Sequence, residues 1–308
     1  MPVALITGIS GFVGKHLQQR LAGQGWQVYG FDVRSGMKDV FVGDLTDRAV
    51  ISHAISESKP DVIIHLAGVI KSAAPEIFYK VNLLGTLALL DAVVESGLHP
   101  KIVAASSSAV YGRKSGERPI SERVQLHPVT DYAVSKVAQE AAALRYYYDS
   151  YALPVMIVRM FNLLGPGQPA DLACSAFARQ IALAERSGQT EIVTGNLDAR
   201  RDFVDVRDAV RAFELIAQKG KPGQIYNVCS ERGVAIRKCL REMMSMSTNQ
   251  LSARVDADRV QKDDVPVQVG SYQKLRKAMG WSPKISLHQS LTDLLNDWRV
   301  RVAEVESK

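Results

Sequence analysis

A glycine-rich turn near the start of the chain constrains the fold more than any other feature. The apolar run Val3–Thr7 predicts a strand, and Phe12–Gly23 predicts a helix with one apolar face. Glycines between a strand and a helix allow a tight turn and let the backbone approach a pyrophosphate, which the free N–H groups of the helix start would bind. The spacing therefore predicts a dinucleotide site made by Gly8, Gly11, Phe12, Val13 and Gly14.

Short apolar runs alternate with longer helical patterns through residue 159. The predicted strands are Trp26–Phe31, Val40–Val42, Val62–Leu66, Lys101–Ser106 and Val155–Arg159, and the predicted helices are Thr46–Ser58, Glu76–Ser96 and Asp131–Tyr148. This alternation is typical of βαβ units. We therefore predict an α/β fold with a doubly wound parallel sheet of the Rossmann type.

A cluster of glycine and proline at residues 165–169 marks a change in this rhythm. Residues 1–165 are predicted to form an NAD(P)-binding domain, and residues 166–308 mainly a smaller C-terminal α/β substrate domain. Segments near 201–230 are expected to cross back to the first sheet. Helices are predicted at Ala173–Arg186, Asp208–Gln218, Arg237–Met244 and Leu287–Val302.

Composition excludes several other classes of protein. The net charge of +6 comes from scattered Lys and Arg without interleaved aromatic residues, so we expect no nucleic-acid partner. The three cysteines, Cys174, Cys229 and Cys239, match no metal-site spacing and predict reduced thiols and no bound metal. We see no signal peptide and no apolar run long enough to span a bilayer, and therefore expect a cytoplasmic protein without a membrane partner.

Residues at the ends of the predicted strands complete the dinucleotide site. Asp32 would accept hydrogen bonds from the ribose hydroxyls and repel a 2′-phosphate, which favours NAD(H). Arg34 lies two residues further on and would suit a 2′-phosphate, so NADP(H) stays open. After the third and fourth strands, residues are predicted to flank the adenine and let the cofactor pass: Asp44, Leu45, Leu66, Ala67 and Gly68.

A tyrosine and a lysine form the candidate catalytic pair. Tyr132 and Lys136 are four residues apart, so both would lie on one face of a helix, one turn apart. A cation beside a phenol stabilises the phenolate and helps it exchange a proton. Ser107, in a run of three serines at the carboxyl end of the fifth strand, would hold the reacting oxygen.

These motifs, in this order, resemble the extended short-chain dehydrogenase/reductase family over nearly the whole length. The glycine turn, Ser107 with Val110-Tyr111-Gly112, and the Tyr132/Lys136 pair fall where that family has them. The chain also resembles the family at residues 159–162 (Arg-Met-Phe-Asn), 201–206 (Arg-Asp-Phe-Val-Asp-Val) and 280–283 (Gly-Trp-Ser-Pro).

Within the family, residues 162–168, 195–202 and 226–230 resemble the group that acts on GDP-mannose derivatives. The resemblance implies a nucleotide-sugar substrate bound by Ser108, Asn162, Arg201 and Arg259. It also implies a homodimer, paired through the helices Glu76–Ser96 and Asp131–Tyr148.

Two positions depart from the family pattern. Dehydratases of this group carry a glutamate two residues before the tyrosine of the Tyr-Gly pair, and here that position is Ala109, which cannot move a proton. A frequent Arg-Pro pair is replaced by Gln261-Lys262, so Arg259 or Lys262 would have to serve the phosphate. The resemblance then implies reduction of the C4 ketone of a GDP-4-keto-6-deoxyhexose. A nucleotide-sugar 4-epimerase and a non-catalytic cofactor-binding scaffold are the alternatives.

Overall fold

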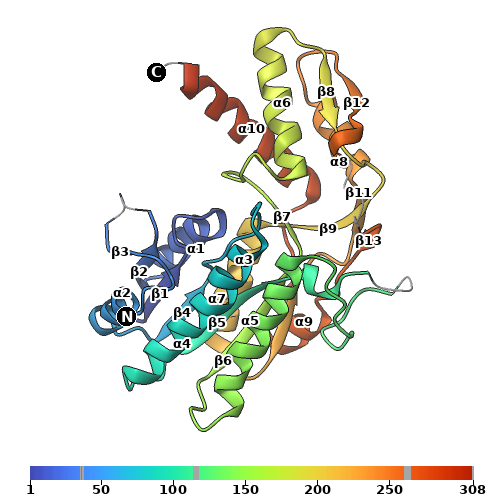
Figure 1. The fold of residues 1–308 in the computed structure, drawn as a ribbon. Coiled ribbons are helices and arrows are strands. Elements are labelled where there is room, and N and C mark those ends of the chain that lie inside the picture. The colour runs from blue at the N-terminus through green and yellow to red at the C-terminus, as the bar shows by residue number, and fades with distance from the viewer. Residues whose placement is uncertain (35, 37, 114–117, 260–264, 307–308) are drawn as a thin grey trace.

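Seven parallel strands form a twisted sheet through the larger part of the molecule (Figure 1). Their order is β10-β6-β5-β4-β1-β2-β3. The strands are β1 (Val3–Thr7), β2 (Gln27–Asp32), β3 (Val40–Val42), β4 (Val62–His65), β5 (Lys101–Ser107), β6 (Val155–Met160) and β10 (Ile225–Val228). The computed structural model describes residues 1–308 except 35, 37, 114–117, 260–264 and 307–308. The predicted doubly wound α/β fold is confirmed.

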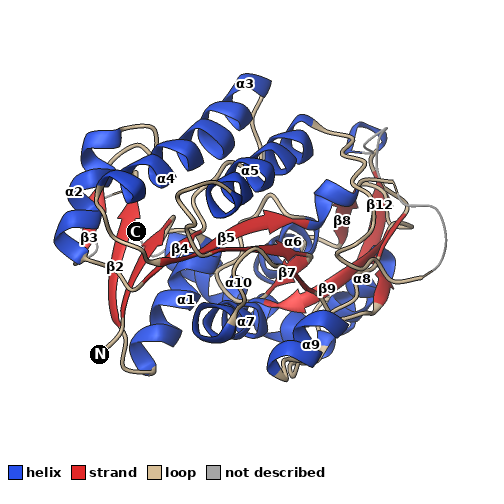
Figure 2. Ribbon diagram, turned by 90° about the horizontal axis from the view of Figure 1, so that it is seen from below, coloured by secondary structure: helices blue, strands red, loops and turns tan. Residues whose placement is uncertain are grey.

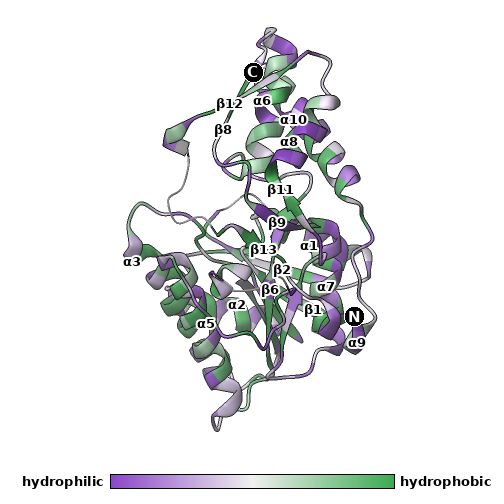
Figure 3. Ribbon diagram, turned by 90° about the vertical axis from the view of Figure 1, so that its right-hand side faces the viewer, coloured by the Kyte–Doolittle hydropathy of each residue, from purple (hydrophilic) through white to green (hydrophobic). Residues whose placement is uncertain are grey.

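Helices cover both faces of this sheet (Figure 2), as buried parallel strands require. One face carries α1 (Phe12–Gly23), α7 (Val206–Lys219) and α9 (Gln273–Met279), and the other carries α2 (Arg48–Ser58), α4 (Gly85–Glu95) and α5 (Asp131–Tyr148). The strands between them are predominantly hydrophobic (Figure 3). Trp281, fully buried, extends the first layer, and its indole N–H donates to the carbonyl of Asp208 at 3.1 Å.

The single helix predicted over Glu76–Ser96 is divided in the structure. It begins with α3 (Pro75–Phe78), continues as a π-helical segment η1 (Tyr79–Leu84) and ends as α4. The wider turn brings the fully buried Asn82 against the chain after β4, where its side chain accepts from the Val69 N–H and donates to the Val69 carbonyl. A π-turn of this kind often lies at a functional site.

The same stretch corrects one expectation from the sequence. Pro75–Ser96 is long and apolar enough to span a membrane by length and composition, with a mean hydropathy of 1.6, and 44% of its most apolar window is buried in the protein. The sequence did not predict a run of this length, because the polar residues Lys80, Asn82 and Asp91 interrupt it. Its buried side chains, such as Leu89 and Val93, belong to the apolar layer in which α2, α4 and α5 pack against the sheet.

A smaller α/β region lies beside the carboxyl end of the sheet. Strand β9 (Arg200–Asp205) pairs with β7 (Asn162–Leu164), β11 (Gly233–Ala235) and β13 (Val267–Gln268), while β8 (Glu191–Thr194) pairs with β12 (Ser252–Val255). Helices α6 (Ala173–Ser187), α8 (Ile236–Ser245) and α10 (Leu287–Glu306) pack around a core of their own. The short helical turn η3 (Ala257–Arg259) follows β12, and another, η2 (Ser108–Tyr111), follows β5 of the large sheet.

The chain crosses between the two regions more than once. After β9 it returns through α7, which packs against the large sheet, and then adds β10 to the edge of that sheet beside β6. Val204 and Phe213 are buried in the same core as Leu17 of α1. The regions are therefore joined through shared packing, and a division near residue 165 stays a prediction.

Candidate active site

A cleft of 560 Å³ opens at the carboxyl ends of the strands, where the large sheet meets the smaller region. One side is lined by the turn after β1, the end of β4 and the end of β5. The other side is lined by β7, the loop after it, the start of α6 and β9. This is the position at which open α/β sheets bind ligands, because the strand order reverses between β1 and β4.

The turn after β1 is shaped for a phosphate-bearing ligand. Gly8 has a φ of +74°, and a Cβ added to it would lie 2.8 Å from the Ala67 nitrogen. A Cβ on Gly14 would lie 2.3 Å from the Gly8 carbonyl oxygen. The helix that follows begins at Phe12 without a side-chain cap, so its first N–H groups face the cleft mouth without a competing side chain. These residues fit the pyrophosphate of a nicotinamide dinucleotide.

Asp32 holds this turn from the end of β2. Its carboxylate accepts from the Ser10 N–H at 2.9 Å and from the Arg34 N–H at 3.2 Å. Arg34 is exposed and lines the cleft. The carboxylate that suits a ribose and the guanidinium that suits a 2′-phosphate therefore lie at the same end of the cleft.

A buried histidine fixes the end of β4. Burial lowers the pKa of His65 to about 3, with nearby Lys136 acting in the same direction, so the ring is neutral. Thr86 donates its hydroxyl proton to the Asn82 carbonyl at 2.7 Å, so it accepts from His65 Nε2 at 2.8 Å. Nδ1 then accepts from Thr7 at 2.7 Å. The chain of bonds assigns the Nε2–H tautomer and ties β4 to β1 and α4.

The predicted catalytic residues lie together. Thr130 caps α5 by accepting from the Ala133 N–H at 3.2 Å, and this fixes the first turn, which carries Tyr132. The ring of Phe78 lies edge-on at 6.1 Å from the Tyr132 ring centre. Burial raises the pKa of Tyr132, while a hydrogen bond from Ser107 opposes that shift. The phenol is therefore protonated at neutral pH, in contact with the serine hydroxyl.

Lys136 follows one turn along α5 and is buried. Its Nζ donates to the Ala105 carbonyl of β5 at 2.7 Å. Burial lowers its pKa to about 8, and the carboxylate of Glu140 opposes that shift. Gly68 lies beside it, because a Cβ there would be 3.9 Å from Nζ.

On the opposite side of the cleft, Asn162 and Arg201 come together from β7 and β9. Their neighbour Asp202 is fully buried and accepts from both the N–H and the hydroxyl of Ser230 at 2.6 Å, and from Gly270 N–H at 3.1 Å. Burial raises the pKa of Asp202 to about 6, against the effect of these hydrogen bonds. The buried carboxylate of Asp202 thus holds the segments around Ser230 and Gly270 beside β9, the strand that carries Arg201.

Several predicted residues do not line this cleft, among them Asp32 and the buried Lys136. Asp44 is exposed and binds Thr46, whereas Leu45 is buried against Gly85. Ala67 contacts Gly8 beneath the turn. Ser108 donates to Gln268 at 3.0 Å and is buried. Arg259 ends η3, its side chain is not among the described parts of the chain, and Gln261-Lys262 lies outside the described residues.

The cleft also contains residues that were not predicted from the sequence to belong to the site. Ser106, Met160 and Phe161 lie at the ends of β5 and β6, next to residues that were predicted. Leu172, Cys174 and Ile236 come from the starts of α6 and α8. No local motif marks this second group, because only the tertiary packing of the smaller region brings it to the cleft.

Lys71 links the two sides near this group. Its Nζ donates to the Asp171 carbonyl at 2.6 Å and lies 3.2 Å from the Asp171 carboxylate. The neighbouring residues Ile70 and Leu172 both line the cleft.

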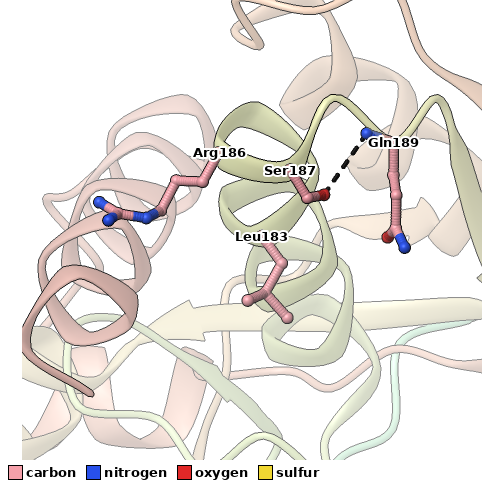
Figure 4. A pocket seen from close by; sticks show the side chains of 4 residues that line it. All are labelled: Leu183, Arg186, Ser187 and Gln189. Carbon is pink, nitrogen blue, oxygen red and sulfur yellow. Dashed lines mark hydrogen bonds between the residues drawn. The ribbon is translucent and has the colours of Figure 1, made fainter. Parts of the chain in front are cut away.

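A separate hollow lies at the carboxyl end of α6 (Figure 4), lined by Leu183, Arg186, Ser187 and Gln189. The Gln189 N–H donates to the Ser187 hydroxyl at 3.4 Å, which closes the turn after the helix. It brings together no acid–base pair, so the chemistry belongs to the cleft.

Comparison with known proteins agrees with this geometry. A family model described as GDP-mannose 4,6 dehydratase matches residues 5–294. The GDP-6-deoxy-D-mannose reductase of Pseudomonas aeruginosa is 34% identical, over 97% of this chain and 98% of that protein. A solved structure of RMD from P. aeruginosa, complexed with NADPH, superposes with a TM-score of 0.88 at 33% identity, covering 98% and 100% of the two chains. The UDP-glucose 4-epimerase of Thermotoga maritima, solved with UDP-glucose, gives a TM-score of 0.88 at 25% identity, covering 97% and 99%.

The fold and these relatives define an NAD(P)-dependent enzyme of the short-chain dehydrogenase/reductase type that acts on a nucleotide sugar, and the glycine turn and the Ser107/Tyr132/Lys136 cluster fit that class. Within that class, the chain belongs to the GDP-mannose 4,6-dehydratase family.

The glycine turn leads to the first prediction. In Gly14→Ala the new Cβ would meet backbone oxygens of Gly8 and Ile9 at 2.3 and 2.5 Å, so the turn must open. We expect the dissociation constant for NADH or NADPH to rise at least about tenfold, measured by nucleotide fluorescence titration.

Gly23→Ala is the matched control, because it lies at the end of the same helix with no atom within 4 Å of the added Cβ. It should bind the nucleotide like the original protein. Unchanged binding by Gly14→Ala would contradict the assignment of the turn to the cofactor.

Proposed function

We propose that the protein reduces the C4 ketone of a GDP-4-keto-6-deoxyhexose with NAD(P)H. The observation that carries this proposal is the phenol of Tyr132 in hydrogen-bond contact with Ser107 at the cleft, combined with Ala109 in place of a dehydratase acid. Similarity to a GDP-6-deoxy-D-mannose reductase and to a GDP-6-deoxy-D-talose 4-dehydrogenase, 28% identical over 90% of each chain, supports the substrate class.

In this proposal each polar residue has one task. NAD(P)H, held by the glycine turn, supplies the hydride that reduces the ketone. Tyr132 gives its proton to the oxygen that becomes the new hydroxyl, and Ser107 holds that oxygen by a hydrogen bond. Lys136, as a buried cation, stabilises the phenolate left on Tyr132 until solvent returns the proton.

The smaller region would bind the nucleotide diphosphate. Arg201 is proposed to contact the phosphates, since its planar guanidinium suits phosphate oxygens. Asn162, on the adjacent strand β7, would hold the sugar beside Tyr132.

Nucleotide-sugar 4-epimerization is the second candidate function. The superposition with a UDP-glucose 4-epimerase supports it, because the same three catalytic residues would serve. We rank this function second because that epimerase is 25% identical to this chain, whereas the GDP-6-deoxy-D-mannose reductase is 34% identical.

The assay that tests the proposal uses GDP-4-keto-6-deoxy-mannose with NADH or NADPH. We expect stoichiometric loss of absorbance of the reduced nicotinamide and formation of a GDP-deoxyhexose. The relative rates measure the cofactor preference, for which Asp32 favours NADH and Arg34 favours NADPH. No oxidation of either cofactor would reject the reductase, and interconversion of UDP- or GDP-sugars without cofactor consumption would support the epimerase.

Replacing the proton donor gives a second test. Tyr132→Phe removes the phenolic proton but keeps the ring against Phe78, so kcat should fall about 10²- to 10⁴-fold while nucleotide affinity is retained. Tyr148→Phe changes a 73% exposed tyrosine of the same helix and should leave kcat unchanged. Full activity in Tyr132→Phe would eliminate the proposed acid.

We further propose that the enzyme works as a homodimer in the cytoplasm. Apolar side chains remain exposed on the proposed pairing helices, with Leu84 at 53% and Val134 at 39%. An interface would remove them from water. The three cysteines are free thiols, as expected of a reducing compartment.

Light scattering should give twice the 33.8 kDa of one chain. Leu84→Glu should shift the mass toward that of a monomer, whereas Val300→Glu, at a comparable exposure of 58% on α10, should not. A monomeric mass for the unmodified protein would rule out the dimer.

A further inference from the structure

A buried ion pair lies directly behind the catalytic residues, and the proposed reaction does not use it. Arg159 of β6 donates from Nη2 to Glu140 Oε2 at 2.6 Å and from Nε to Oε1 at 2.9 Å. The side chains are 4% and 5% exposed. Tyr111 accepts from Arg159 at 3.0 Å and donates to Asn227 at 2.7 Å, so the pair is enclosed by further hydrogen bonds.

Stability alone does not account for this pair. Removing two charges from water costs about as much as their mutual attraction returns, and apolar residues of similar volume often serve a core equally well. The strand residues next to the pair, Val158 of β6 and Ala105 of β5, are buried and apolar. The charges therefore call for a role other than packing.

The first contact with the active site runs along α5. Glu140 lies one turn after Lys136, and its carboxylate favours the charged form of the buried ammonium, against the burial that lowers the lysine pKa to about 8. Within the described parts of the chain, the other titratable groups near Lys136 bring no negative charge. His65 of β4 is neutral, Tyr132 of α5 keeps its proton, and Arg159 of β6 is bound to Glu140 itself.

The second contact runs through the sheet. Ser106 donates to Glu140 Oε1 at 2.5 Å. Ser106 also pairs in register with Arg159, so the ion pair ties the last residues of β5 to both β6 and α5. Ser107, whose hydroxyl bonds to Tyr132, is the next residue.

We propose that Glu140 is a positioning residue that keeps Lys136 protonated and holds the serine end of β5 beside Tyr132. The proposal rests on the reductase site proposed above. It adds a group that acts on the chemistry through Lys136 and Ser107 without touching the substrate.

Glu140→Gln tests the electrostatic part. With lysine labelled at ¹³Cε, the Lys136 signal, assigned from its loss in Lys136→Arg, should titrate at a pH about one unit lower than in the unmodified protein. The basic limb of the kcat profile should move down by the same amount. Turnover should then fall about fivefold at pH 8 and almost not at pH 6.

Arg159→Met separates electrostatics from damage to the fold. It removes the cation that neutralises Glu140, so the Lys136 titration should move to higher pH, opposite to Glu140→Gln. Glu140→Asp keeps the negative charge, so its Lys136 titration should lie close to that of the unmodified protein. If Glu140→Gln does not fold, Glu140→Gln/Arg159→Met leaves no unpaired buried charge, and its Lys136 titration should lie at lower pH than that of Arg159→Met.

Glu214→Gln is the matched control. Glu214 is an 8% exposed carboxylate paired with Arg20 at 2.5 Å between α7 and α1, on the other face of the sheet. It should change neither the Lys136 titration nor the kcat profile.

In Glu140→Gln the side-chain oxygen can still accept from Ser106, so a loss of kcat of equal size at every pH would overturn the proposal. An unshifted Lys136 titration in the same variant would overturn it as well. Failure of the unmodified protein to reduce the ketone would instead reject the proposed function. The Lys136 titration would still decide the role of Glu140 in that case.

Discussion

A Cβ on Gly8 would lie 2.8 Å from the Ala67 nitrogen, so the turn after β1 and the end of β4 touch directly. This contact places the start of α1 over the point where the strand order reverses. Hydrogen bonds from neighbouring residues hold the two segments in this contact. Asp32 binds the turn on one side, and the Thr7–His65–Thr86 bonds fix the end of β4 on the other. The shape of the cleft at its cofactor end follows from that one approach of two backbones.

Two titratable groups buried near the cleft differ in charge: one is neutral and the other is a cation. His65 is kept neutral, with each ring nitrogen assigned to one partner, and so acts as a fixed spacer between strands. Lys136 is buried beside a carboxylate, so a charge persists where water is excluded. The difference follows from position, since α5 supplies an anion one turn away from Lys136 and β4 supplies none to His65.

Features that depend on local sequence were predicted well. The glycine turn, the strand that ends at Asp32 and the helix that carries Tyr132 and Lys136 each have a periodic pattern and a recognisable start. The π-turn at Asn82 and the inward bond of Ser108 to Gln268 could not be predicted, because each depends on a partner far away in the sequence. The same reason kept Leu172, Cys174 and Ile236 out of the predicted site, and it concealed the ion pair between Glu140 and Arg159.

The return of the chain to the large sheet has a consequence for how the molecule could arise or be divided. Strand β10 covers one edge of β6, and α7 covers a face of the same sheet, yet both follow β9 of the smaller region in the chain. A fragment that stopped before them would expose an unpaired strand edge and an uncovered apolar face, the two features that promote aggregation. During synthesis on the ribosome, the nucleotide-binding half can be completed only after much of its partner region has been made.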